Sequence, residues 1–188
     1  MQLTITTGTN NDDNSFLDLD IADSTGGALV IDGGPNGVTI QPGISPWTDR
    51  IFDIPQVGGQ ASPVTLRNLT IQGGGPPNNE TGGFPCINGG GGVRNWSGGA
   101  LTLENVTIQN NAMPVNGGGV CHQGAGPLTV LSGTIRNNVA NGGSGGGIFY
   151  DAFGSLFIDN STVLSNTASR SGGGIHDSAS VSMTVQNS

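Results

Sequence analysis

The sequence predicts an all-β protein wound into a parallel β-helix, a solenoid of stacked rungs that has little or no α-helix. The first observation is a triple-glycine run that recurs at Gly90, Gly117, Gly145 and Gly172, every 27 or 28 residues. A constant period of this size is typical of solenoids. The second is the alternation of apolar and polar residues between the glycine runs, which gives each strand one buried face. The third is that no long segment shows the 3.6-residue apolar period of a helix.

The apolar residues of the four copies fall into columns when the copies are aligned on their glycines. Each copy then holds three short strands with one inward face each, separated by Gly, Asn and Ser, which favour turns. Such a rung is triangular, and about seven rungs fit the chain. The inward columns are Val93, Val120, Ile148 and Ile175; Leu101, Leu128, Leu156 and Met183; Leu103, Val130, Ile158 and Val185; and Ile108, Ile135 and Val163.

The N-terminal half continues the pattern less regularly, so the chain is expected to form a single β-helix domain. The segment VTLRNLTIQGG from Val64 matches LTLENVTIQNN from Leu101, 37 residues later. The excess over the regular period predicts a loop, GPPNNETGGFPCIN, inserted into one rung. Within residues 1–188 we therefore expect irregular rungs over 1–63, a rung with the inserted loop over 64–89, and regular repeats over 90–188.

The charge of the chain argues against two classes of partner. Net charge is −8, and the five basic residues are arginines spread singly along a sequence without lysine. Binding to nucleic acid or to an anionic membrane surface relies on clustered Lys and Arg, so neither partner is expected. No apolar run approaches the roughly 20 residues of a membrane-spanning helix, so no transmembrane segment is expected.

Two kinds of polar column accompany the apolar ones. Asparagine recurs between two inward strand residues, where it can adopt a left-handed backbone and hydrogen-bond to the rungs above and below. Threonine columns suit the outward faces of strands; the alternative, an ice-binding face, is disfavoured because Phe157 interrupts one of them. The expected structural ladder consists of Asn68, Asn105, Asn160 and Asn187, with Ser132 filling the gap.

These motifs resemble a known group of repeats. The run GGGV…LTLENVTIQNN from Gly90, with DLDI at Asp18, LVIDG at Leu29 and DRIFDI at Asp49, is similar to the β-helix regions of secreted bacterial proteins of the CSLREA and choice-of-anchor type. It is also similar to the repeats of polymorphic outer-membrane proteins. The resemblance implies a right-handed, single-stranded parallel β-helix, exported or at the cell surface, with a structural, adhesive or binding role. It implies no catalytic residues, and within residues 1–188 we expect no leader, anchor or signal peptide like those of such proteins.

One column of the repeat carries the most varied chemistry. It contains Asn95, His122, Tyr150 and Asp177. His122 and Asp177 are two rungs apart, about 10 Å, which is too far for a direct hydrogen bond. We interpret the position as a turn, where Asn, Asp and His are common, and expect no catalytic role. His122 and Tyr150 remain weak ligand-binding candidates.

Two further pairs of residues are weak candidates. Trp47 and Trp96 could present their rings to a sugar, although packing in turns is the favoured interpretation of both. Asp12 and Asp13 in NNDDNS could offer oxygens to calcium, but the spaced ligands of known calcium loops are missing and a solvated loop is favoured. We therefore expect no cofactor and no metal.

The two cysteines are predicted to form a disulfide. Cys86 lies in the inserted loop, and alternation turns Cys121 outward one rung away, in the column of Arg94, Phe149 and His176. The bond would tie the loop to the rung and would fit export to an oxidising compartment. The alternative is two unpaired thiols.

The sequence therefore predicts a non-catalytic exported or cell-surface scaffold of the adhesin type, a rigid spacer or a ligand-presenting surface, with surface glycans as partners. One alternative is a subunit that stacks end to end into an extracellular filament, because neither end carries a polar cap; a fragment of a longer rod is favoured over it. The other is a polysaccharide lyase or glycoside hydrolase, which would need converging carboxylates. Its candidate residues are His122, Asp151, Asp159 and Asp177.

Overall fold

The computed structural model describes residues 19–22, 26–43, 49–56, 59, 61–75, 86–179 and 182–188. These residues form four parallel β-sheets and contain no helix, so none of them makes a helix that could cross a membrane. The prediction of an all-β chain is confirmed for this part of the molecule. Trp47, Asp12, Asp13 and residues 76–85 of the inserted loop lie outside it.

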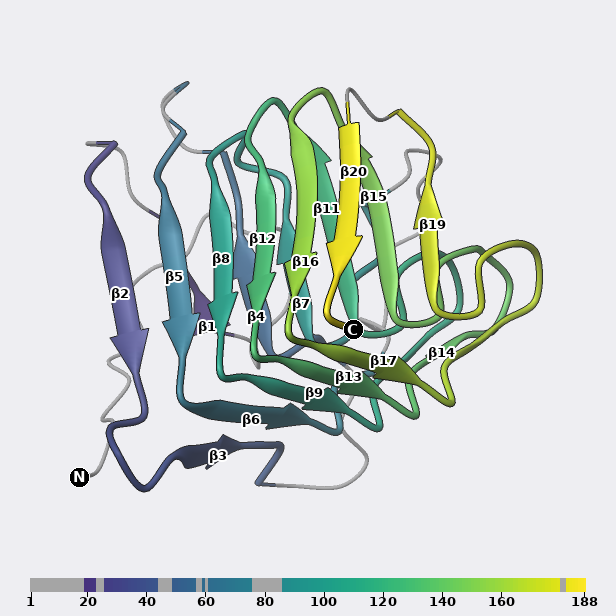
Figure 1. Cartoon of the computed structure of the whole chain (residues 1–188), viewed down its shortest axis with the longest axis horizontal. Helices are drawn as coiled ribbons and strands as arrows, with labels where there is room; N and C mark the ends of the chain where they lie inside the picture. The colour runs from purple at the N-terminus through teal and green to yellow at the C-terminus, as the bar shows by residue number, and fades with distance from the viewer. Residues whose placement is uncertain are drawn as a thin grey trace.

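Each sheet is a stack of parallel strands, to which a repeat contributes one strand (Figure 1). Sheet A contains β1 (Leu19–Asp20), β4 (Phe52–Ile54), β7 (Val93–Asn95), β11 (Val120–Gly124), β15 (Ile148–Ala152) and β19 (Ile175–Asp177). Sheet B contains β2 (Leu29–Asp32), β5 (Val64–Arg67), β8 (Leu101–Glu104), β12 (Leu128–Leu131), β16 (Ser155–Asp159) and β20 (Ser182–Gln186). Sheet C contains β3 (Val38–Ile40), β6 (Leu69–Gln72), β9 (Thr107–Gln109), β13 (Thr134–Arg136) and β17 (Thr162–Leu164). The small sheet contains β10 (Ala112–Met113), β14 (Val139–Ala140) and β18 (Thr167–Ala168).

The chain passes from sheet A to B to C and then through the small sheet before it returns to sheet A. Every strand pairs in parallel with its counterpart one repeat later, so Val93, Val120, Ile148 and Ile175 are in register as the sequence alignment predicted. This topology is compatible with a parallel β-helix. The prediction of three strands per rung was incomplete. A fourth strand of two residues follows the bend at Asn137, whose backbone is left-handed with φ of 55°.

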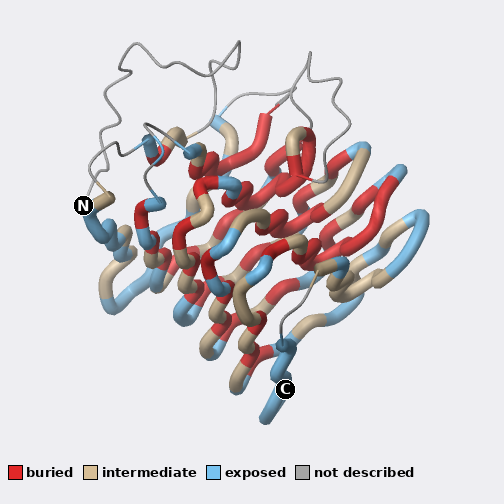
Figure 2. The backbone as a smooth tube through the Cα atoms, turned by 90° about the horizontal axis from the view of Figure 1, so that it is seen from above, coloured by how far each residue is buried: buried red, intermediate tan, exposed pale blue. Residues whose placement is uncertain are grey.

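The core lies between the sheets and follows the predicted apolar columns. Leu101, Leu128 and Leu156 are stacked in sheet B and fully buried, while the threonines that alternate with them are partly exposed. Figure 2 shows the buried residues repeating from rung to rung between the two exposed ends. Each such leucine contributes about 1.5–3 kcal/mol through burial, which makes the apolar columns a main source of stability.

A ladder of asparagines, of which Asn111 and Asn138 are buried and Asn166 is partly buried, runs along the turn between sheet C and the small sheet, and the sequence did not predict it. The Nδ2 of Asn111 donates to Oδ1 of Asn138 at 2.9 Å, and the Nδ2 of Asn138 donates to Oδ1 of Asn166 at 3.0 Å. Asn138 also donates to the carbonyl of Ile108 at 2.9 Å. The last glycine of the first three triple runs borders this ladder: a Cβ on Gly119 would lie 3.0 Å from Nδ2 of Asn138. The recurrent glycine and the recurrent buried asparagine therefore fit one another.

Replacing Asn138 with alanine is expected to lower the free energy of unfolding by about 2–3 kcal/mol, because it leaves the Asn111 amide and the Ile108 carbonyl buried without their partners. Urea denaturation measures this loss. Asn141→Ala is the matched control, since Asn141 is exposed and its side chain makes no hydrogen bond to the described residues. Equal midpoints for the two variants would contradict a stabilising role of the ladder.

The predicted outer ladder has the expected backbone but only some of the expected side-chain contacts. Asn68, Asn105, Ser132, Asn160 and Asn187 all have φ between 48° and 55°. The Nδ2 of Asn105 donates to Oδ1 of Asn68 at 2.8 Å, and that of Asn160 donates to Oγ of Ser132 at 3.2 Å. Asn187 instead donates to Oδ1 of Asp159 at 2.8 Å. These asparagines recur because the turn needs a left-handed residue, and the hydrogen bonds are secondary.

Candidate functional site

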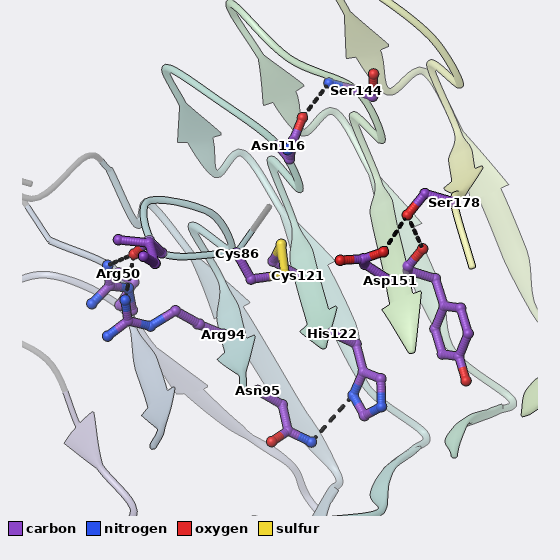
Figure 3. The surroundings of a disulfide bond; sticks show 12 residues. Arg50, Cys86, Arg94, Asn95, Asn116, Cys121, His122, Ser144, Asp151 and Ser178 are labelled. Carbon is purple, nitrogen blue, oxygen red and sulfur yellow. Dashed lines mark hydrogen bonds between the residues drawn. A yellow bond between two sulfur atoms is a disulfide. The ribbon is translucent and has the colours of Figure 1, made fainter. Parts of the chain in front are cut away.

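A buried charged cluster lies on the outer face of sheet A, where the chain re-enters the stack after the inserted loop. Asp53, Arg94, Cys121, Phe149 and His176 occupy one outward column of neighbouring strands. We call the group of Arg50, Asp53, Cys86, Arg94 and Cys121 the insertion clamp; Figure 3 shows its two arginines and its two cysteines. All five are buried, although three of them point away from the core, because the re-entering segment covers them.

Asp53 joins the two arginines of the clamp. It alternates with the inward residues Phe52 and Ile54 on β4, which turns its carboxylate toward the outer face. The Nε of Arg94 donates to Oδ1 of Asp53 at 2.8 Å, and its Nη2 pairs with Oδ2 in a two-pronged ion pair. The Nη1 of Arg50 lies 3.7 Å from the same Oδ2. Planar two-pronged pairs of this kind are the strongest hydrogen-bonded ion pairs.

The same arginines hold the end of the inserted loop. The Nη2 of Arg50 donates to the carbonyl oxygen of Ile87 at 3.4 Å, and Nη1 of Arg94 donates to the same oxygen. The neighbouring residue, Cys86, forms a disulfide with Cys121, with Cα atoms 5.6 Å apart. The predicted pairing is therefore present, and ionic and covalent contacts fix adjacent residues of one segment.

An aromatic rim borders the clamp. Arg94 lies beneath Trp96, with the guanidinium carbon 5.2 Å from the ring centroid, a cation–π distance. Trp96 is 40% exposed and, of the predicted ligand candidates that the structure describes, is the one that faces solvent. Phe149 packs on the disulfide and stacks on His176, with ring centroids 5.2 Å apart.

A second polar group lies inside the stack, on the opposite face of sheet A. Asn95, His122, Tyr150 and Asp177 are in register, as predicted, but they belong to strands β7, β11, β15 and β19 and not to a turn. Alternation from the inward Val120 turns His122 inward as well. Asn95, His122 and Tyr150 are fully buried, so the two weak ligand candidates His122 and Tyr150 lie in the core.

His122 is held as a neutral ring by its two hydrogen bonds. Its Nε2 lies 2.9 Å from the carbonyl oxygen of Gly126, which can only accept, so Nε2 carries the proton. Its Nδ1 accepts from Nδ2 of Asn95 at 3.1 Å. The ring stacks on Tyr150 with centroids 5.4 Å apart. Burial lowers the pKa of His122 to about 4, with the Gly126 hydrogen bond acting in the opposite direction.

The buried imidazole is expected to make stability depend on pH. Because the pKa of His122 is about 4 in the folded chain and 6.5 in the unfolded chain, the unfolded state binds the proton first as pH falls. The contribution of the neutral His122 to the free energy of unfolding is complete above pH 6.5. It is lost between pH 6.5 and pH 4, which lowers the free energy of unfolding by about 3 kcal/mol. Urea midpoints across this range measure the loss. His122→Gln should flatten the decrease, and an unchanged pH profile in that variant would contradict the assignment.

Tyr150 has a buried hydroxyl that has no hydrogen-bond partner among the residues the structure describes. Burial, reinforced by the negative charge of Asp177, raises the pKa of Tyr150 to about 12. Removing an unpartnered hydroxyl relieves a desolvation cost. We therefore expect Tyr150→Phe to be as stable as the natural chain or more stable, by up to about 1 kcal/mol, in urea denaturation. A clear loss of stability would show that the hydroxyl has a partner in solution.

The remaining predicted residues do not converge on a common site. Asp151 accepts from Oγ of Ser178 at 2.6 Å, and Asp159 accepts from Gln186 and Asn187 in the next rung. Over the described ranges, no group of three or more His, Cys, Asp or Glu residues is placed to hold a metal ion.

Sequence reasoning missed the charged half of the clamp. Arg50 and Asp53 lie in DRIFDI, where Asp53 alternates with the apolar Phe52 and Ile54, and Arg94 lies in the outward column that contains Cys121. In a chain with five basic residues, an outward arginine beside a predicted disulfide was the available signal. Comparison with protein-family models, curated proteins and solved structures finds no match to this chain. Function is therefore inferred from the arrangement of its residues.

Proposed function

We propose that the chain is a rung array of a right-handed parallel β-helix that acts as a non-catalytic scaffold, exported or at the cell surface. A β-strand, crossover and parallel β-strand in one sheet is right-handed in nearly all proteins, which supports the hand. The observation that carries the proposal is that the side chains with the most chemistry, Arg50, Asp53, Arg94, His122 and Tyr150, are all buried. They bind to one another, to backbone groups or to stacked rings.

Location and family belong to the same proposal. Disulfides persist in oxidising compartments, so the Cys86–Cys121 bond supports export. The resemblance of the GGGV…LTLENVTIQNN copies to the β-helical repeats of CSLREA, choice-of-anchor and polymorphic outer-membrane proteins supports a bacterial surface or secreted protein of the adhesin type. In this proposal the stacked sheets set a rigid length, and the exposed rim at Trp96 presents a ring to surface glycans.

A panel of plant, algal and bacterial polysaccharides tests the absence of catalysis. The chain is incubated with each polysaccharide, and new reducing ends and the ultraviolet absorbance of lyase products are recorded. We expect no turnover. Turnover that disappears in Asp177→Asn or Asp151→Asn would contradict the scaffold function and show that the chain is a polysaccharide-active enzyme.

A glycan array tests the presenting surface separately. We expect weak, selective binding that Trp96→Ala abolishes, since an exposed ring can stack on a sugar. Phe153→Ala is the matched control, because Phe153 is an exposed aromatic that directly follows a strand of sheet A, as Trp96 does. Binding that neither substitution changes would show that the ligand site does not include Trp96. The absence of binding would contradict a glycan-presenting role and favour a rigid spacer.

A second candidate function is end-to-end self-assembly, and the exposure of core columns favours it. Leu156 and Ile158 are buried, whereas Met183 and Val185, their partners in β20, are 51% and 47% exposed. At the other side of the described stack, Leu29 and Val38 are also exposed. Two unlike apolar faces of this kind fit a head-to-tail contact with a second copy. Sedimentation velocity over a wide concentration range tests it: polymers that Met183→Asp prevents would support assembly, and monomers throughout would exclude it.

A further inference from the structure

Four asparagines of the chain are followed by glycine, and the structure separates one of them from the others. The pairs are Asn36–Gly37, Asn88–Gly89, Asn116–Gly117 and Asn141–Gly142. Asparagine is a thermally labile residue. Its side-chain amide carbon is open to attack by the next backbone nitrogen, most easily when that residue is glycine, which has no side chain to obstruct the approach. The attacking nitrogen must be free of a hydrogen-bond acceptor to reach the carbon.

Three of the four glycine nitrogens are engaged. Gly37 donates to the carbonyl of Gly34 at 3.0 Å, Gly89 to that of Cys86 at 3.2 Å, and Gly117 to that of Ser144 at 3.0 Å. In the part of the chain that the structure describes, the Gly142 N–H has no acceptor.

The exposure and hydrogen bonds of the four asparagine side chains also single out Asn141. Asn88 is buried beside the insertion clamp, and Oδ1 of Asn116 accepts from the backbone of Ser144 at 2.9 Å. Asn141 is exposed, and its hydrogen bonds in the structure involve backbone atoms. Asn36 is exposed too, but its neighbour Gly37 is tied into a turn. Exposure and a free nitrogen coincide at Asn141–Gly142.

We propose that Asn141–Gly142 is a self-modification site at which the folded chain converts asparagine to aspartate and isoaspartate. The Gly142 nitrogen gives up its proton to water and bonds to Cγ of Asn141. The bond from Cγ to Nδ2 breaks, and the nitrogen leaves as ammonia with a proton returned from water. A second water molecule opens the five-membered imide at either carbonyl. The sum is one asparagine and one water giving one acid and one ammonia, without oxidation or reduction.

The modification falls on a contact between rungs. The Asn141 N–H donates to the carbonyl of Met113 at 2.7 Å, and Oγ of Ser169 donates to the Asn141 carbonyl. Isoaspartate adds a carbon to the backbone at this point, so it displaces one of these bonds at the end of the small sheet. Both products also add a negative charge to a chain whose net charge is already −8.

Trypsin separates the four pairs, because the arginines at 50, 67, 94, 136 and 170 place them in the different peptides 1–50, 68–94, 95–136 and 137–170. The oxidised full-length chain is incubated in heavy-oxygen water at neutral pH and then digested, so that conversion in the folded chain carries the solvent isotope. Fragment ions assign each conversion to its asparagine. We expect Asn141 to convert roughly ten-fold faster than Asn36, because Gly37 must first break its hydrogen bond.

The same chain, reduced and unfolded in urea, is the matched comparison. All four pairs should then convert at similar rates, since no fold distinguishes them. Asn141→Gln should remove the fast conversion and leave the rates at Asn36 unchanged. Gly142→Ala is unsuitable, because its Cβ would lie 2.4 Å from the carbonyl oxygen of Pro114. A rate at Asn141 equal to or below that at Asn36 in the folded chain would overturn the proposal.

Discussion

Replacing Asp53 with asparagine is expected to lower the free energy of unfolding by about 3–5 kcal/mol, because it removes the carboxylate from a buried ion pair. Asp53 receives two hydrogen bonds from Arg94, and Arg50 lies beside it. Asparagine has the same shape but no charge, so the loss would be electrostatic and not a consequence of a cavity. Urea or thermal denaturation of the oxidised chain measures it.

The matched control is another Arg–Asp pair that also joins adjacent rungs. Arg67 lies 2.9 Å from Asp32 on sheet B, but both side chains are substantially exposed to solvent. Water screens such a pair, so Asp32→Asn should leave the urea midpoint nearly unchanged. If the two substitutions had equal effects, burial under the inserted segment would not be the source of the stability assigned to Asp53.

The double substitution Cys86→Ser with Cys121→Ser is expected to destabilise the chain by about 3–4 kcal/mol. The disulfide closes a loop with a sequence separation of 35 residues, and without it the unfolded chain gains the conformational freedom that the bond removes. Reduction of the natural chain should produce the same shift of the urea midpoint. The serine variant should not respond to reductant, which controls for other effects of the reagent. Coincident denaturation curves for the oxidised chain and the serine variant would contradict the prediction.

The two effects should not be additive. Asp53 positions the arginines that bind the Ile87 carbonyl, and Cys86 is the preceding residue, so both hold the same segment. Once the disulfide is absent, that segment can leave the sheet, and water can then reach Arg94. The cost of Asp53→Asn in the serine variant should therefore be smaller than in the natural chain, and the difference between the two costs measures their coupling.

Local repetition explains why much of the fold could be predicted. A repeat of constant length brings equivalent residues together on adjacent rungs, so alignment of the copies already gave the register of Val93, Val120, Ile148 and Ile175. The left-handed asparagine positions followed from steric preferences of single residues. The disulfide pairing followed from alternation on β11 and from the place of the inserted loop.

The candidate site was only partly predictable, and His122 illustrates an avoidable error. Its column was correctly aligned, but it was interpreted as a turn, whereas β11 extends from Val120 to Gly124. Continued alternation from Val120 would have turned His122 into the core. The shift of its pKa depends on the burial that follows.

The sequence by itself determined the rung period, the inward columns and the outward position of Cys121, because each depends on spacing within one repeat. Only the tertiary structure decided that Asn111 and Asn138 are the buried members of the pairs Asn110–Asn111 and Asn137–Asn138, since two identical neighbours differ only in the direction each side chain takes. It also decided that Asp53 meets Arg94, 41 residues later, across the rung that holds the inserted loop. Such contacts depend on how far the insertion displaces the chain and on what it covers, and no repeat in the sequence records either.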